Sequence, residues 1–149
     1  MEPGAAAEDQ PVLGSYRLED QVGFYLRRAG QRHASIFAEL IGGDMTATQW
    51  AALVKLAELH SVSQNLLGRE TAMDAATIKG VVDRLCKRGL LATAPDPDDG
   101  RRTQVSITPA GLSLVARSVD RAALITAETL KPLDAGERQA LLDLLRRIA

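Results

Sequence analysis

The sequence predicts a mainly α-helical fold with one small β-hairpin. Apolar residues recur at spacings of three and four along most of the 149 residues, which is the period of helices that pack on one side. Two short strand-like runs, 90–93 and 103–107, flank a turn rich in Pro, Asp and Gly. With 46% hydrophobic residues the chain can bury one core, so we expect about six helices and one hairpin in a single domain.

The N-terminal part divides into a tail and a long helix. Residues 1–14 contain Pro, Gly, Ala and acidic residues without periodicity, which is typical of a disordered tail. From Arg17 to about Ile41 the pattern predicts a helix of roughly seven turns. Gly42 and Gly43 end it. The expected inner stripe is Leu18, Val22, Tyr25, Leu26, Ala29, His33, Ile36, Phe37 and Leu40.

Two capped helices follow. Thr46 and Gln49 form the pattern of a capping box, and the helix that they open runs to about His60. Its inward side chains are expected to include Trp50. Ser63 can cap the next short helix.

The helix after a tight turn is the most clearly patterned one. Asp74 can cap its first turn, and Ile78, Val82 and Leu85 fall on one stripe that predicts the core face. Lys87-Arg88-Gly89 closes it with cations and a glycine. The opposite face carries small and polar residues, which suit close approach to a DNA major groove: Ala75, Ala76, Thr77, Lys79, Gly80, Asp83 and Arg84.

Helix, turn, helix and hairpin together predict a winged helix-turn-helix unit over residues 46–108. The hairpin turn DPDDGRR (residues 96–102) has two interpretations. It is either a solvated turn in which Asp and Arg pair with each other, or a wing whose Arg side chains contact DNA. The patterned helix just upstream favours the wing.

The C-terminal part predicts two more helices. Thr108 followed by Pro109 is a cap with Pro at the first helical position, and the helix should end near Leu130. Asp134 and Glu137 form a second capping box before an apolar helix that reaches the C-terminus. The expected inner residues are Leu112, Val115, Val119, Ala122 and Thr126 in the first, and Leu141, Leu142, Leu144, Leu145 and Ile148 in the second.

The last helix is too apolar to lie exposed on a monomer. We therefore expect residues 15–43 and 109–149 to form a dimer interface, with one domain spanning 15–149.

A family resemblance supports this interpretation. The runs VVDRLCKRGLL, DPDDGRR and VSITPAG resemble the MarR (multiple antibiotic resistance regulator) family of bacterial repressors, most strongly across residues 46–115. In that family an Asp-x-Arg element in the wing orients an Arg into the minor groove, and here it corresponds to Asp99-Gly100-Arg101. The chain departs from the family at Thr71, where Leu is usual, and at Ala72, where a turn Gly is usual.

These observations select the candidate DNA-binding residues. Arg101 is expected in the minor groove and Arg102 on a phosphate. The whole set is Gln64, Asn65, Ala76, Thr77, Lys79, Gly80, Arg84, Asp99, Arg101 and Arg102.

The resemblance also implies an effector pocket between the long helices and the DNA-binding part. The candidate lining residues are Tyr25, Arg28, Arg32, His33, Phe37 and Trp50. Aromatic walls beside cations suit a planar aromatic acid or its coenzyme A thioester. The alternative for the set is that these residues are core and solvated surface. For His33 by itself, a hydrogen-bonded position in the core is the expectation and the pocket is the alternative.

Composition limits the other function classes. The formal charge is −1, and residues 63–108 hold seven Lys or Arg against six Asp or Glu, so charge alone does not indicate nucleic-acid binding. Aromatic residues are 3%, which disfavours binding by base stacking. Catalytic motifs, metal-ligand clusters and cofactor motifs are not found, and His33 and His60 are isolated.

The single cysteine, Cys86, excludes an internal disulfide. It is expected to pack as a small hydrophobe, and a redox switch activated by Lys87 and Arg88 is the alternative. The sequence shows neither an export signal nor a membrane span, so we expect a cytoplasmic protein.

We expect a homodimeric transcriptional repressor that a small molecule releases from a palindromic operator. Two other classes stay open. One is a winged helix used only for protein contacts, which the near-neutral charge favours; the other is an enzyme that binds a small molecule on an all-α scaffold.

Overall fold

The computed structural model describes residues 12–149, so most of the predicted tail, residues 1–11, lies outside the described part. Residues 12–15 form a turn, in which the Tyr16 amide donates to the Leu13 carbonyl at 2.9 Å. The elements are a 3-10 helix (Leu18–Asp20), α1 (Val22–Ile41), α2 (Ala47–Leu59), β1 (Ser61–Ser63), α3 (Gln64–Glu70), α4 (Ala75–Lys87), β2 (Leu91–Pro95), β3 (Thr103–Ile107), α5 (Pro109–Thr129) and α6 (Ala135–Ile148).

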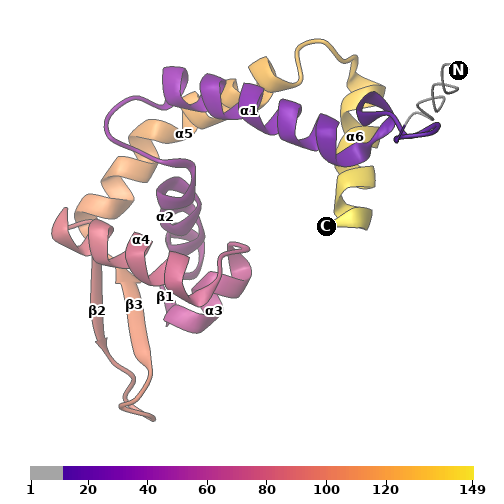
Figure 1. The fold of residues 1–149 in the computed structure, drawn as a ribbon. Coiled ribbons are helices and arrows are strands. Elements are labelled where there is room, and N and C mark those ends of the chain that lie inside the picture. The colour runs from indigo at the N-terminus through magenta and orange to yellow at the C-terminus, as the bar shows by residue number, and fades with distance from the viewer. Residues whose placement is uncertain (1–11) are drawn as a thin grey trace, which may run out of the picture.

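The molecule has a compact lobe and a long helical arm (Figure 1). Helices α2, α3 and α4 and the sheet make the lobe, from which the β2–β3 hairpin extends. Helices α1 and α5 lie side by side and form the arm. Helix α6 lies at the far end of the arm from the hairpin.

The two predicted capping boxes are confirmed. Thr46 and Gln49 form both bonds of the capping box at 3.2 Å, and Asp134 and Glu137 form theirs at 2.9 Å. The predicted start of the first helix is wrong, because α1 begins at Val22 and not at Arg17. Gln21 has an extended backbone that separates α1 from the 3-10 turn before it.

The core is built mainly on α4. Ile78, Val82 and Leu85 are at most 1% exposed, as the stripe predicted. They pack with buried residues of α2, α3, β2, β3 and α5: Ala52, Leu53, Leu56, Leu67, Leu91, Val105 and Val115. A second, smaller cluster of Phe37, Ile41 and Ile125 joins α1 to α5.

The sheet has three strands and not the two that were predicted. Its order is β1-β3-β2, and both pairings are antiparallel. Strand β1 pairs Ser61 with Ser106 and Ser63 with Gln104, which anchors the hairpin to the start of α3. The predicted strand 103–107 is confirmed, and its partner β2 runs from 91 to 95 where 90–93 was expected.

The predicted inner stripes of the long helices are only partly right. In α5, Val115 is buried as expected, but Val119 is 50% exposed and Leu112 is also exposed. The small residues Gly111 and Ser118 are buried instead. In α1 only Phe37 and Ile41 are buried, both near its C-terminal end.

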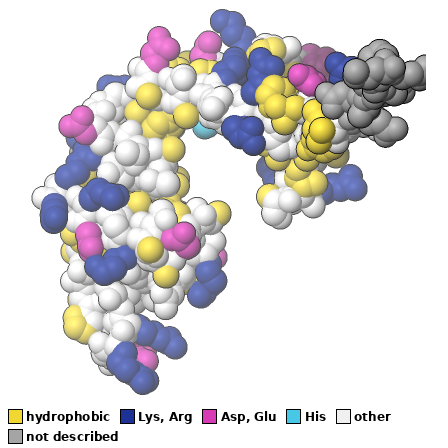
Figure 2. Space-filling model, in the orientation of Figure 1, with side chains coloured by type: hydrophobic (Ala, Val, Ile, Leu, Met, Phe, Trp, Pro, Cys, Tyr) yellow, Lys and Arg dark blue, Asp and Glu magenta, His cyan; other side chains and the backbone are white. Residues whose placement is uncertain are grey.

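Helix α6 has no buried residue in the single chain. Leu144 is 54% exposed and Ile148 is 68% exposed. Hydrophobic side chains accordingly cover much of the surface at this end of the molecule (Figure 2). Within residues 12–149 no helix has both the length and the apolar character needed to cross a membrane.

Candidate nucleic-acid interface

The turn between α3 and α4 sets the angle of the helix-turn-helix. Ala72 has a φ of +54°, the left-handed conformation that favours glycine. The Met73 amide donates to the Gly68 carbonyl at 2.8 Å, and a Cβ on Gly68 would lie 3.1 Å from the Met73 carbonyl oxygen. The two helices therefore meet in a close turn although Ala stands where Gly is usual.

The N-terminus of α4 is capped as predicted. The Asp74 carboxylate accepts from the Thr77 amide at 2.7 Å, and this bond lowers the pKa of Asp74. Ala76, Thr77, Lys79 and Arg84 are exposed on the side of α4 opposite the core. The candidate residues of this helix thus share one accessible face.

Two interactions organise that face. Lys79 Nζ lies 2.8 Å from the Asp83 carboxylate one turn away. A Cβ on Gly80 would lie 3.5 Å from Arg84 Nη2, so the guanidinium lies close over the glycine. An alanine Cβ at position 80 would make ordinary van der Waals contact with the Arg84 guanidinium.

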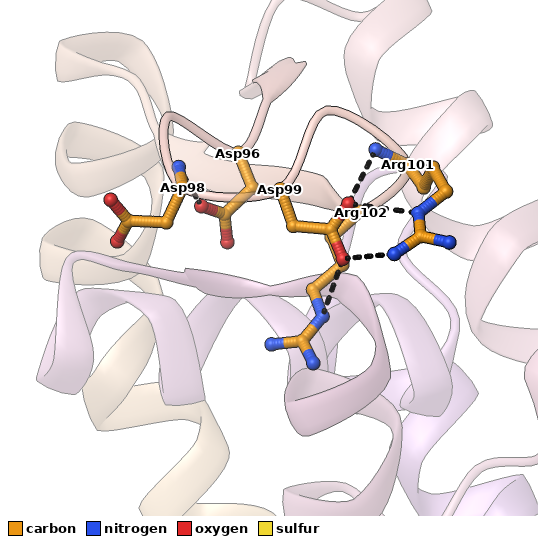
Figure 3. A network of polar contacts seen from close by, with 5 residues as sticks. All are labelled: Asp96, Asp98, Asp99, Arg101 and Arg102. Carbon is orange, nitrogen blue, oxygen red and sulfur yellow. Dashed lines mark hydrogen bonds and ion pairs between the residues drawn. The ribbon is translucent and has the colours of Figure 1, made fainter.

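The tip of the hairpin holds its arginines through one carboxylate (Figure 3). Asp99 Oδ1 accepts from the backbone amide and from Nε of Arg101, each at 3.1 Å, while Arg102 Nε lies 3.7 Å from Asp99 Oδ2. The bonds from Arg101 hold the pKa of Asp99 below its usual range. The Arg101 side chain is nevertheless 92% exposed, so it is oriented by Asp99 and still accessible to a partner.

The hairpin also meets α3. Gln64 and Asn65 line a cavity of about 200 Å³ together with Arg101, Arg102 and Thr103. Strand β1 makes this juxtaposition, because its pairing with β3 brings the first turn of α3 against the hairpin. The structure thus unites two candidate groups that are more than thirty residues apart in the sequence.

The six candidate effector residues do not form one site in the single chain. Tyr25 and His33 line a mainly apolar cavity of about 530 Å³ between α1, α5 and α6. Phe37 is buried in the smaller core cluster, against which Trp50 packs. Phe37 is therefore a core residue, and Trp50 packs mainly with the core.

The two arginines of the candidate effector set have other contacts. Arg28 lies over the Phe24 ring, 5.5 Å from its centroid. Arg32 donates to the Thr129 and Glu128 carbonyls at 2.6 and 2.9 Å, and so caps the C-terminal end of α5. Arg32 thus holds α1 and α5 together at the edge of the cavity.

His33 is exposed, which corrects the expectation that it lies in the core. Its Nδ1 lies 2.8 Å from the Thr129 hydroxyl, and that hydroxyl donates its own proton to the Ile125 carbonyl. While the hydroxyl donates to Ile125, it accepts from a proton on Nδ1 of His33. In neutral His33, Nε2 is then left as a hydrogen-bond acceptor.

Cys86 is partly buried and packs against the main core. Burial raises the pKa of the Cys86 thiol, and the negative charge of Asp83 raises it further. A raised pKa keeps the thiol protonated, so the structure favours the packing role over the redox switch. Among residues 12–149 no three His, Cys, Asp or Glu side chains lie together in a way that could hold a metal ion.

Comparison with known proteins adds four findings. The sequence model of the MarR family matches residues 43–102. The HTH-type transcriptional repressor NicR of Pseudomonas putida is 39% identical over 134 residues, which cover 89% of this chain and 85% of that protein.

Two solved structures share the whole fold. A probable transcriptional regulator from Pseudomonas aeruginosa is 53% identical with a TM-score of 0.86, covering 89% of this chain and 100% of that one. BpsR of Bordetella bronchiseptica, whose structure concerns regulation of DNA binding by 6-hydroxynicotinic acid, is 41% identical with a TM-score of 0.87. That match covers 91% of this chain and 97% of the BpsR chain.

Proposed function

This chain belongs to the MarR family of DNA-binding transcriptional regulators, and we propose that it is a homodimeric repressor that an aromatic acid releases from a palindromic operator. The observation that supports DNA binding most directly is the Asp99–Arg101 pair at the hairpin tip. An arginine held in place yet 92% exposed suits insertion into a narrow minor groove. We propose residues 46–108 as the DNA-binding part.

The exposed face of α4 would enter the major groove. Thr77, Lys79, Gly80 and Arg84 are the proposed contacts there, with Ala76 allowing close approach. Gln64, Asn65 and Arg102 would contact phosphates, because they line the cavity between α3 and the hairpin.

The dimer would be formed by residues 15–43 and 109–149. Exposed apolar side chains of α1, α5 and α6 support this, since a contiguous patch of this kind is unusual on a monomer. Two-fold symmetry of the dimer would make the operator a palindrome with half-sites about one helical turn apart.

The proposed effector is a planar aromatic carboxylic acid with a single ring. Regulation of BpsR by 6-hydroxynicotinic acid supports a free acid over a coenzyme A thioester. In this chain the cavity lined by Tyr25 and His33 offers an apolar enclosure with a polar edge at His33 and Arg32. The ligand must prefer the dimer that cannot bind DNA, because equal affinity for both forms would shift nothing.

A DNA-binding titration tests the proposal. The probe is a labelled duplex from upstream of the protein's own coding region, followed by fluorescence anisotropy at fixed salt concentration. We expect 6-hydroxynicotinic acid to weaken DNA binding of the wild type, and to do so at higher concentration in His33→Ala. Lack of binding to this DNA would contradict the repressor proposal, whereas DNA binding that the acid leaves unchanged would contradict only the effector.

A further inference from the structure

We propose that a second cavity, on the lobe side of the arm, binds a small doubly charged oxyanion such as a phosphate group. This cavity has a volume of about 280 Å³ and lies between the α1–α2 turn, the C-terminal end of α4 and the middle of α5. Arg88, Arg117 and Arg121 line it. None of these arginines belongs to the proposed DNA-binding or effector residues.

Within residues 12–149 the three guanidinium groups have no carboxylate partner. Arg88 Nη1 donates to the Asp44 carbonyl at 3.2 Å, and Arg121 Nη1 donates to the Ile41 carbonyl at 3.2 Å. Arg117 Nη1 donates to the Ser113 hydroxyl at 3.2 Å. Across residues 12–149, the ion pairs within 4.0 Å involve other cations and leave all three arginines without an acidic partner.

The charge of the cavity is therefore unbalanced. Among the described residues that line it, Asp44 is acidic and three are arginines. Three cations held around one space repel one another, and an anion that enters the space removes this repulsion. Each arginine keeps most of its five N–H donors for such a ligand.

The site is shaped for Arg121 in particular. Gly42 has a φ of +71°, and a Cβ at this position would lie only 2.7 Å from Arg121 Nη1. A glycine is thus required for the guanidinium to lie against the turn. Ser118 is 6% exposed and lines the same cavity.

The chemistry of the lining selects the class of ligand. Guanidinium groups bind phosphate and carboxylate oxygens through paired N–H donors, and Ser118 can add a neutral donor. The volume lies below the range of about 300–1,000 Å³ that drug-sized ligands occupy. No aromatic side chain lines the cavity, which distinguishes it from the proposed effector cavity with Tyr25 and His33.

An anion at this place would connect the two parts of the molecule. Arg88 is the C-terminal cap of α4, whereas Arg117 and Arg121 belong to α5 of the arm. A ligand that binds both would hold the lobe in one position relative to the arm. If DNA binding changes that position, it changes the affinity for the anion. By linkage, the anion then changes the affinity for DNA by the same factor.

Isothermal titration calorimetry of the full chain with sodium phosphate tests the inference without DNA or effector. Sodium sulfate, disodium succinate and sodium chloride at the same ionic strength are the other titrants. We expect saturable binding of phosphate and sulfate and none of chloride. Tighter binding of succinate than of phosphate would assign the site to dicarboxylates, and would overturn the phosphate assignment.

Variants locate the binding. Arg121→Gln and Arg117→Gln are expected to weaken phosphate binding about tenfold each, because each removes a charge-assisted hydrogen bond. Arg27→Gln, an exposed arginine on α1, is the matched control and should bind as the wild type does. Arg117→Gln guards against misfolding, because within residues 12–149 the exposed Arg117 side chain forms its hydrogen bond to Ser113 of its own helix and not to another element.

Three results would overturn the inference. One is the absence of saturable phosphate binding, and another is equal weakening in Arg27→Gln. The third is a loss of DNA affinity in Arg117→Gln without any anion binding, which would assign these arginines to the DNA backbone.

Discussion

Three of the six acidic side chains in residues 63–108 serve partners inside the protein. Asp74 caps α4, Asp83 pairs with Lys79, and Asp99 orients Arg101. A count of seven cations against six acids treats all of them as equal surface charges, and this is why the sequence composition alone did not indicate DNA binding. These three acids position groups that we propose as DNA contacts.

Arg101→Ala should lose the minor-groove contact while leaving the fold intact, because the side chain is almost fully exposed. We expect a loss of about 1–3 kcal/mol of binding free energy per half-site, measured by fluorescence anisotropy on operator DNA. Lys79→Ala should weaken binding less and reduce its salt dependence. Unchanged affinity of the Arg101 variant, with normal circular dichroism, would show that the hairpin does not contact DNA.

The cap of α4 makes stability depend on pH in one direction. The Thr77 amide lowers the pKa of Asp74, so the cap contributes fully above the ordinary value of 3.8 and is lost as pH falls through the lowered value. Asp74→Ala should therefore lower the Tm at pH 7, and the difference from the wild type should vanish in strong acid. A difference in Tm that stays constant from pH 7 to pH 2 would contradict this mechanism.

Ala72 is a place where a single substitution should stabilise the protein. Its φ of +54° strains an L-residue but not glycine. We expect Ala72→Gly to raise the free energy of unfolding by up to about 1 kcal/mol in urea titrations. Ala116→Gly, in the exposed middle of α5, is the control and should lower it by about 1 kcal/mol. A loss of stability in Ala72→Gly would mean that the left-handed turn is not strained.

At the scale of elements, the features that local residues decide could be predicted. Thr46 with Gln49 and Asp134 with Glu137 form their caps within one turn, so the sequence pattern suffices. Strand β1 could not be predicted, because three residues, Ser61–Ser63, carry no alternating pattern. It exists only through its pairing with β3, more than forty residues later.

The inner face of α5 was mispredicted for a related reason. Hydrophobic periodicity pointed to Leu112 and Val119, but Gly111 and Ser118 face the lobe because small residues allow close packing. Apolar residues on the other side of α5 left two candidate faces, and periodicity alone cannot decide between them. The candidate effector residues lie in different places for a comparable reason. Only the C-terminal end of α1, near Phe37, packs on the lobe.

The close approach at Gly111 predicts a large effect of a single methyl group. A Cβ there would meet the Leu90 carbonyl oxygen and the Ile107 side chain at less than 3 Å. Gly111→Ala should lower the free energy of unfolding by about 1–3 kcal/mol through overpacking. Gly136→Ala, in the first turn of α6 with its nearest contact at 3.5 Å, is the matched control and should not destabilise. Equal stability of the two variants would show that α5 can shift away from Leu90.

At the scale of the whole molecule, the proposed dimer can be tested by one charge on α6. Burial of a leucine contributes about 1.5–3 kcal/mol, and a symmetric dimer buries each leucine twice. We therefore expect Leu144→Glu to raise the dimer dissociation constant at least about tenfold in sedimentation experiments. Leu59→Glu, also exposed but on α2 and outside the proposed dimer interface, should leave it unchanged. A wild-type monomer at micromolar concentration would contradict the dimer.

The lack of buried residues in α6 also bears on how long the protein survives in a cell. A helix that rests on few contacts of its own chain opens at little cost in free energy, and opened segments are where proteases cut. Pairing with a second copy would protect α6 by mass action. The lifetime of the regulator would then grow with its abundance, so that a scarce regulator is degraded faster than an abundant one.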